Sequence, residues 1–232
     1  MQAPLSRSAA AAAGLVAALL APAALGADPA ARQALVPRLS GQALVDALRK
    51  GGLTILMRHT ATEPVAPDPE TFDIADCKTQ RDLSERGREQ ARAIAAALPK
   101  LGIRISKVAS SPYCRCLETG RLAFGTVEVS EVLSVGDDLS FEEKHQRGRE
   151  VRNLLATAPE PGTNAVLLTH TGTLLYSFGL DSTPEGIAHV FQPGPAGTSV
   201  YLGSLAPEDW PRLAGLETPP AGAAAPEREA PK

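Results

Sequence analysis

Two short apolar segments in different halves of the chain each end in a histidine. They are Leu53-Thr-Ile-Leu-Met-Arg58-His59-Thr60 and Ala165-Val-Leu-Leu-Thr169-His170-Thr171. A short apolar run bounded by polar residues and glycine is typical of a strand buried on both faces, as in a parallel sheet covered by helices. Each histidine would then lie where its strand leaves the sheet. Because α/β proteins bind ligands at the carboxyl ends of parallel strands, the pair predicts two imidazoles at one site, and therefore an enzyme.

Helical and strand patterns alternate along the rest of the chain. Helices are expected at residues 42–50, 84–98, 113–124, 147–156 and 171–178. Strands are expected at residues 53–57, 108–109, 127–132, 187–191 and 198–202, and before His170. Pro99 and Gly102 are expected to end the second helix, and long loops are expected at residues 60–80 and 134–141. This order predicts a single α/β domain over residues 41–212, a three-layer αβα sandwich with a mostly parallel sheet.

The two ends of the chain differ from this domain in composition. Residues 1–26 carry one charge, at Arg7, followed by an Ala/Leu/Val stretch and the small-residue signal Ala24-Leu25-Gly26. This pattern is typical of a cleaved signal peptide and predicts an exported, periplasmic protein with no membrane span after cleavage. An uncleaved anchor is the alternative, but the stretch is short for a membrane span and contains Pro22. Residues 217–232, rich in Ala and Pro, are expected to form a disordered tail.

Charge and cysteine content narrow the possible functions. The formal net charge is −3 and basic residues are scattered, which argues against a nucleic-acid partner and leaves anion binding to a local site. The cysteines are Cys77, Cys114 and Cys116. In an exported chain Cys77 could pair with Cys114 or Cys116, which point to different faces of one helix, or all three could be buried thiols.

An arginine joins the two histidines in the predicted site. Ser110-Ser111-Pro112 has the pattern of a helix start, with a serine cap and a first-turn proline, and places Arg115 in the first turn. Arg115, Arg58 and a helix N-terminus suit a tetrahedral oxyanion such as a phosphoryl group. One histidine could attack phosphorus, kept neutral by the arginines, while the other, protonated, binds the transferring oxygens. The sequence has no HExxH motif, so neither a metal nor a cofactor is expected.

These motifs resemble the histidine phosphatase superfamily, in its phosphoglycerate-mutase-like branch, over roughly residues 44–212. The chain is most similar to exported bacterial members, some of which act on phosphorylated envelope sugars. The resemblance implies a metal-independent phosphomonoester hydrolase acting on a small phosphorylated substrate. It also implies that His59 becomes phosphorylated, that Arg58, Arg115 and His170 hold the phosphoryl oxygens, and that Thr62 lines the substrate site.

The resemblance further implies a carboxylate that protonates the leaving oxygen. The candidates, in the loop that follows the next strand after Arg115, are Asp137, Asp138, Glu142 and Glu143. Spacing favours Glu142, although all four could equally form a solvated acidic loop. Arg81 and Arg88 are expected to cap or solvate a helix, and His145 and His189 to be structural.

Three positions depart from the family pattern. Thr60 replaces the glycine usual after the first histidine, Thr171 replaces a small residue after the second, and Ile187 replaces a glutamate in Gly186-Ile187-Ala188. These departures leave open a pseudo-enzyme that binds phosphorylated ligands without turnover. A phosphomutase is a further alternative, against which the export signal argues.

Overall fold

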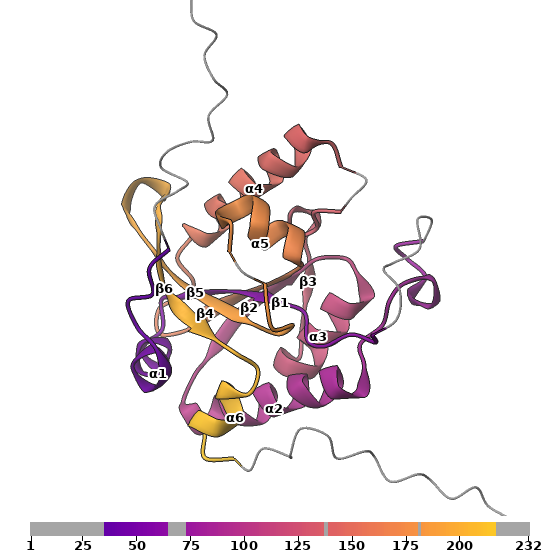
Figure 1. The fold of residues 1–232 in the computed structure, drawn as a ribbon. Helices are drawn as coiled ribbons and strands as arrows, with labels where there is room; N and C mark the ends of the chain where they lie inside the picture. Colours follow the sequence, from indigo (N-terminus) through magenta and orange to yellow (C-terminus); the bar gives the residue numbers. More distant parts are fainter. Residues whose placement is uncertain (1–34, 65–72, 137–138, 181, 217–232) are drawn as a thin grey trace, which may run out of the picture. The chain divides into compact units, whose positions relative to one another are not determined.

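The computed structural model describes residues 35–64, 73–136, 139–180 and 182–216, which belong to one compact unit (Figure 1). Its helices are α1 (Gly41–Lys50), α2 (Glu85–Leu101), α3 (Cys114–Phe124), α4 (Phe141–Leu155), α5 (Thr171–Phe178) and α6 (Asp209–Leu213). Its strands are β1 (Thr54–Arg58), β2 (Ile105–Ser110), β3 (Glu128–Val129), β4 (Asn164–Thr169), β5 (Ala188–Pro193) and β6 (Ser199–Leu205). The predicted signal peptide, the predicted tail and the candidates Asp137 and Asp138 lie outside the described residues.

The strands form one six-stranded sheet in the order β3-β2-β4-β1-β5-β6. β1, β2, β3 and β4 run parallel to one another, whereas β5 pairs antiparallel with both β1 and β6. In the register of β1 and β4, Arg58 lies opposite Thr169. The residue that follows each of these is a histidine, so the register brings His59 and His170 to the same edge of the sheet.

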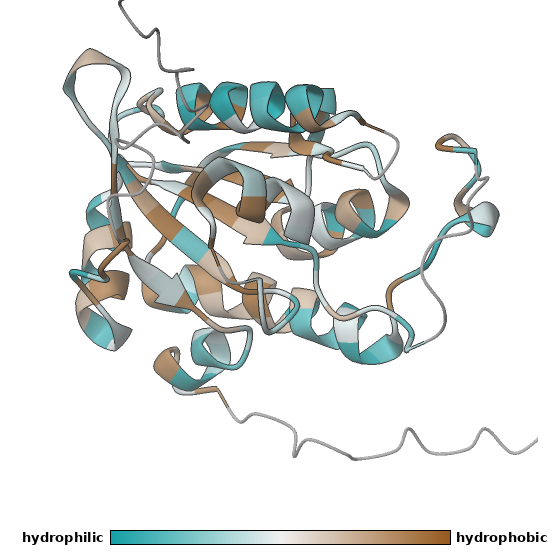
Figure 2. Ribbon diagram, turned by 45° about the horizontal axis from the view of Figure 1, so that its top comes forward, coloured by the Kyte–Doolittle hydropathy of each residue, from teal (hydrophilic) through white to brown (hydrophobic). Residues whose placement is uncertain are grey.

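Helices cover both faces of the sheet, which confirms the predicted α/β class and its three layers. Alternate residues of β1 point to opposite faces, because side chains alternate along a strand. Ile55 and Met57 join the core formed with α1, α2, α3 and α6, whereas Leu56 joins the core formed with α4 and α5. Figure 1 shows α4 and α5 on one side of the sheet and α2, α3 and α6 on the other. Several strands carry apolar colour in Figure 2, as expected for a sheet buried on both faces.

Some predicted element boundaries were wrong, although the expected end of α2 at Gly102 is confirmed. Helix α2 continues through Pro99 to Leu101 and ends at Gly102, which has the left-handed conformation with φ of 68°. The missing N–H of Pro99 costs one hydrogen bond in the last turn, while Leu98 and Leu101 remain buried in the core. Strand β3 has only two residues, because the chain turns into a 3-10 helix (Glu131–Leu133) directly afterwards.

Helix α4 begins earlier than predicted, at Phe141. The Ser140 hydroxyl accepts a hydrogen bond from the Glu143 N–H, and the Glu143 carboxylate accepts one from the Ser140 N–H. This reciprocal capping box starts the helix before its apolar residues begin. In the part of the chain that the structure describes, every helix is too short or too polar to span a bilayer.

Candidate active site

Four side chains predicted from the sequence converge at one edge of the sheet. Arg58 ends β1, His59 follows it, His170 follows β4, and Arg115 lies in the first turn of α3. The His59 N–H donates to the Thr169 carbonyl at 3.1 Å, which ties the two strand ends together. The imidazole centroids lie 5.4 Å apart. Arg58, His59, Arg115 and His170 are called the sheet-edge cluster below, and all except the half-buried Arg58 are at least nine-tenths buried.

The His59 ring is held in one neutral tautomer. Its Nδ1 lies 2.9 Å from the carbonyl oxygen of Thr60. A carbonyl can only accept, so Nδ1 carries the hydrogen and Nε2 keeps its lone pair. Burial, with the charges of Arg115 and Arg58 as smaller causes, holds the His59 pKa well below its usual range despite the opposing bond to Thr60. His59 therefore presents an unprotonated Nε2 at neutral pH.

His170 is also neutral in this arrangement, whereas a protonated ring was expected. Arg115 Nη2 lies 3.4 Å from His170 Nδ1, and because a guanidinium only donates, Nδ1 must accept. The hydrogen of the neutral ring is then on Nε2, which lies 2.7 Å from the Ser111 hydroxyl. Burial first, then the proximity of His59 and Arg115, holds the His170 pKa well below its usual range. His170 thus directs its N–H to Ser111 without carrying a positive charge.

Ser111 and Tyr113 support His170 and Arg115, although the sequence indicated neither role. Ser111 does not cap α3 as expected, because the N-cap residue is Tyr113. The Ser111 hydroxyl instead accepts the Tyr113 N–H at 3.4 Å and contacts His170. The Tyr113 ring meets the His170 ring edge-on, with centroids 4.7 Å apart, and lies 4.6 Å from the Arg115 guanidinium carbon. One aromatic side chain therefore packs against both groups.

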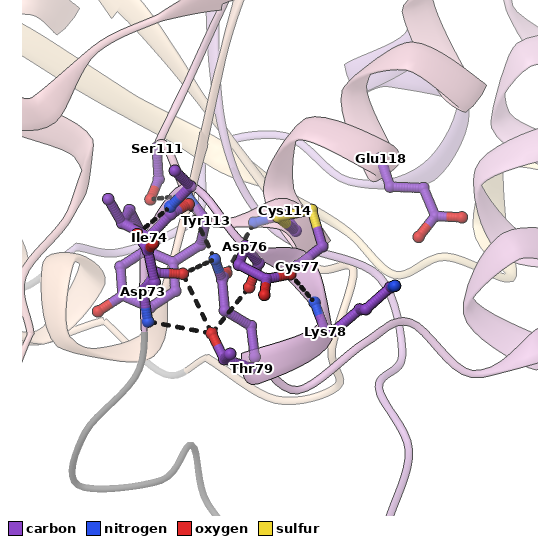
Figure 3. Close-up of a disulfide and its surroundings, with 12 residues drawn as sticks. Asp73, Ile74, Asp76, Cys77, Lys78, Thr79, Ser111, Tyr113, Cys114 and Glu118 are labelled. Atoms are coloured by element: carbon purple, nitrogen blue, oxygen red, sulfur yellow. Dashed lines mark hydrogen bonds between the residues drawn. A yellow bond between two sulfur atoms is a disulfide. The ribbon is translucent and has the colours of Figure 1, made fainter.

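A disulfide lies beside this aromatic side chain. Cys77 is bonded to Cys114, the first residue of α3 (Figure 3). Cys116 is a buried free thiol. The Gln80 side-chain oxygen also accepts the Cys114 N–H at 3.0 Å. These contacts attach residues 73–80 to the start of the helix that carries Arg115.

Arg58 binds a carboxylate that the sequence did not indicate. Its Nη2 donates to Glu185 Oε1 at 2.6 Å, and its Nη1 donates to the Ser182 carbonyl at 2.9 Å. The same carboxylate accepts both the N–H and the hydroxyl of Thr62. Glu185 lies in an aperiodic segment far along the chain from Arg58, so no local pattern links the two residues. Burial is the largest cause that lowers the pKa values of Arg58, His59 and His170, and the charge of Arg81 is a smaller cause for each.

Thr60 packs against Thr119 of α3. Its N–H donates to the Thr119 hydroxyl at 3.2 Å, and the two hydroxyls lie 3.1 Å apart. Thr60 is fully buried against α3. The next residue, Ala61, packs so closely on α2 that a Cβ at Gly87 would meet its carbonyl oxygen at 1.9 Å. The loop after His59 is therefore seated on α2 and α3, and the side chain of Thr60 fits within this packing.

Glu142 and Glu143 lie on α4 and, among their described contacts, make none with the sheet-edge cluster. The Glu142 side chain is 78% exposed and pairs with Arg149 at 3.2 Å. Hydrogen bonds from Ser140 hold the pKa of the Glu143 carboxyl below its usual range. The role of Glu142 as proton donor stays a prediction. Among the described residues, no group of three His, Cys, Asp or Glu side chains is arranged to hold a metal ion.

One family model matches part of the chain. Residues 54–139 match the model of the histidine phosphatase superfamily, branch 1. No curated protein sequence matches the chain.

Similar folds occur among solved structures. A phosphoserine phosphatase from Entamoeba histolytica is 16% identical with a TM-score of 0.49, the alignment covering 68% of this chain and 98% of the other. The protein histidine phosphatase SixA is 16% identical with a TM-score of 0.46, covering 68% and 98%. A mycobacterial glucosyl-3-phosphoglycerate phosphatase is 17% identical with a TM-score of 0.45, covering 65% and 94%. The match to the histidine phosphatase model covers the part of the chain that contains Arg58, His59 and Arg115.

Proposed function

We propose that the protein is a phosphomonoester hydrolase that works through a phosphohistidine on His59. The observation that carries the proposal is the hydrogen bond from His59 Nδ1 to the Thr60 carbonyl. It leaves Nε2 as a lone-pair nucleophile beside two guanidinium groups. A nucleophilic histidine must be neutral, and burial and positive neighbours favour that state here.

The reaction takes place in two steps. His59 Nε2 forms a bond to phosphorus as the bond from phosphorus to the ester oxygen breaks, and the leaving oxygen takes a proton from solvent or from a carboxylic acid, for which Glu142 is the candidate. Water then attacks phosphorus and gives up a proton to the same base or to solvent, which releases inorganic phosphate and restores the neutral imidazole. Arg58 and Arg115 would stabilise the charge on the transferring oxygens, and His170 would join them if its Nε2–H exchanged the Ser111 hydroxyl for a phosphoryl oxygen, so the mechanism uses no metal. We infer a small phosphorylated substrate, such as a phosphorylated sugar of the envelope.

Nucleophilic attack is tested with a panel of phosphomonoesters in excess EDTA. Wild type is compared with His59→Ala and Arg115→Ala, and with His145→Ala as a histidine substitution on α4. We expect no turnover by His59→Ala, a loss of about a hundredfold or more in Arg115→Ala, and wild-type rates in His145→Ala. Mass spectrometry of wild type, after the reaction is quenched without acid, should show one added phosphoryl group on His59. Retained turnover by His59→Ala refutes the mechanism.

A second function has one observation in its favour. The carboxylates of Glu142 and Glu143 are engaged on α4 rather than at the cluster. A cluster without a proton donor could bind phosphorylated ligands and release them unchanged. Phosphate binding by wild type, without turnover of any ester in the panel, would favour this binding protein over the hydrolase.

We also propose that the protein is exported to the periplasm. The disulfide between Cys77 and Cys114 supports this location, because structural disulfides persist mainly in oxidising compartments. Expression of the full chain, followed by intact-mass analysis of the periplasmic fraction, should show a protein that begins near Ala27. A protein found only uncleaved and inside the cell contradicts the proposal.

A further inference from the structure

Glu185 joins two segments that the sequence places far apart. Its Oε1 accepts hydrogen bonds from Arg58 Nη2 at 2.6 Å and from the Thr62 hydroxyl at 3.0 Å, and its Oε2 accepts the Thr62 N–H at 2.9 Å. The side chains of Arg58 and Glu185 are only 13% and 23% exposed. Both carboxylate oxygens are therefore committed to the segment that contains His59.

The guanidinium of Arg58 is anchored at both terminal nitrogens, whereas its Nε is not. Nη2 is held by Glu185 and Nη1 by the Ser182 carbonyl. Its Nε is buried and has no hydrogen-bond partner among the described residues. A phosphoryl group could use this Nε–H together with a remaining terminal N–H, which is the paired arrangement that arginine offers to tetrahedral anions.

We propose that Glu185 is a positioning residue for phosphoryl binding, which holds Arg58 in place and is itself held by Thr62. This inference rests on the proposed function in that Arg58 is the group that meets the phosphoryl oxygens. Thr62 then acts through Glu185, because both of its donors are directed to the carboxylate rather than to a substrate.

Glu185 needs its negative charge as well as its shape to hold Arg58 in place. Burial is the largest effect that disfavours the charged form of Arg58, and Arg81 and Arg115 are close enough to repel it as well. The carboxylate opposes both effects. A glutamine would keep one acceptor oxygen but would direct an NH₂ donor toward either Arg58 or Thr62, so one of the present bonds would be lost.

The test measures the binding of inorganic phosphate by calorimetry, which requires no turnover. Glu185→Ala should weaken phosphate binding about ten- to a hundredfold, as expected when a charged hydrogen-bond partner is lost. Glu185→Gln and Thr62→Val should weaken it less. Glu63→Gln, an exposed carboxylate next to Thr62, is the matched control and should bind phosphate like wild type.

A double-mutant cycle separates positioning from a general structural role. In an Arg58→Lys background, Glu185→Ala should cause no further loss of phosphate affinity, because the group it positions is gone. The same fold-loss in both backgrounds, or wild-type affinity in Glu185→Ala, overturns the inference. A lower urea midpoint with unchanged phosphate affinity in Thr62→Val and Glu185→Gln also overturns it, since Glu185 would then serve stability alone.

Ester hydrolysis distinguishes this inference from the proposed function. In Glu185→Ala, kcat for p-nitrophenyl phosphate should fall by a larger factor than KM rises, because a misplaced Arg58 loses more in the transition state than in the ground state. Normal hydrolysis by Glu185→Ala refutes the role of Glu185 and leaves the hydrolase intact. Absence of hydrolysis in wild type, with the phosphate-binding cycle as expected, refutes the hydrolase and supports the role of Glu185.

Discussion

His59 and His170 couple the stability of the fold to pH, because both rings are buried in their neutral form. Burial is the largest cause that lowers each pKa below the ordinary value of about 6.5. Below pH 6.5 the unfolded chain therefore binds more protons than the folded chain. The stabilisation is fully present above that pH and is lost as the pH falls toward the folded-state pKa values. Each histidine contributes a slope of at most about 1.4 kcal/mol per pH unit.

Urea unfolding between pH 7.5 and 5 measures this slope. We expect the free energy of unfolding to decrease with falling pH in wild type, and to decrease less steeply in His59→Asn. His145→Asn, in which a ring on α4 is replaced, should retain the wild-type slope. An unchanged slope in His59→Asn contradicts the assignment of His59 as a ring that is buried in its neutral form.

At the level of single residues, the sequence was sufficient to predict a site residue where the motif that contains it is local. Arg58 and His59 are adjacent, and Arg115 and His170 each follow a strand, so each could be assigned from its neighbours. Glu185 could not be found in this way, because its partners Arg58 and Thr62 are contacts between distant segments. Proximity of that kind depends on which strands pair.

At the level of elements, hydrophobic periodicity located the helices but not their ends. The start of α4 depends on Ser140 and Glu143, two polar residues that carry no periodic signal. The end of α2 depends on whether buried leucines outweigh one hydrogen bond lost at Pro99. The ends of a helix depend on such local competition between interactions, and the spacing of apolar residues does not reveal its outcome.

The disulfide between Cys77 and Cys114 is expected to stabilise the fold and to hold the first turn of α3. The two cysteines are 37 residues apart in the sequence. For a loop of this length, the bond lowers the entropy of the unfolded chain, which stabilises the fold by about 4 kcal/mol. Reduction should lower the free energy of unfolding by up to that amount. It should also raise KM for phosphomonoesters, because residues 73–80 would no longer be attached beside Tyr113 and Arg115.

Urea unfolding and ester kinetics with and without reductant measure both effects. The double variant Cys77→Ser/Cys114→Ser should resemble reduced wild type and should not respond to reductant. An equal response of wild type and the double variant would show that the reductant acts elsewhere, and would contradict the expected role of the disulfide.

At the level of the whole molecule, the fold class follows from the alternation of strands and helices, but the strand order does not. β1 lies between β4 and β5, two strands from the other half of the chain. The site therefore forms only when distant parts of the chain have paired. Loss of the sheet must accordingly abolish the sheet-edge cluster, and binding at the cluster must stabilise the sheet.

Phosphate should therefore stabilise the entire fold against urea. Trp210 is the only tryptophan of the chain and is fully buried in the core with α2, so its fluorescence reports global unfolding. At a phosphate concentration about 100 times Kd, linkage predicts an increase of about 2.7 kcal/mol in the free energy of unfolding. Arg115→Ala should show a much smaller increase at the same concentration, whereas His145→Ala should match wild type. An equal increase in all three proteins would show that phosphate acts only through general exclusion from the protein surface, because such an effect does not depend on Arg115.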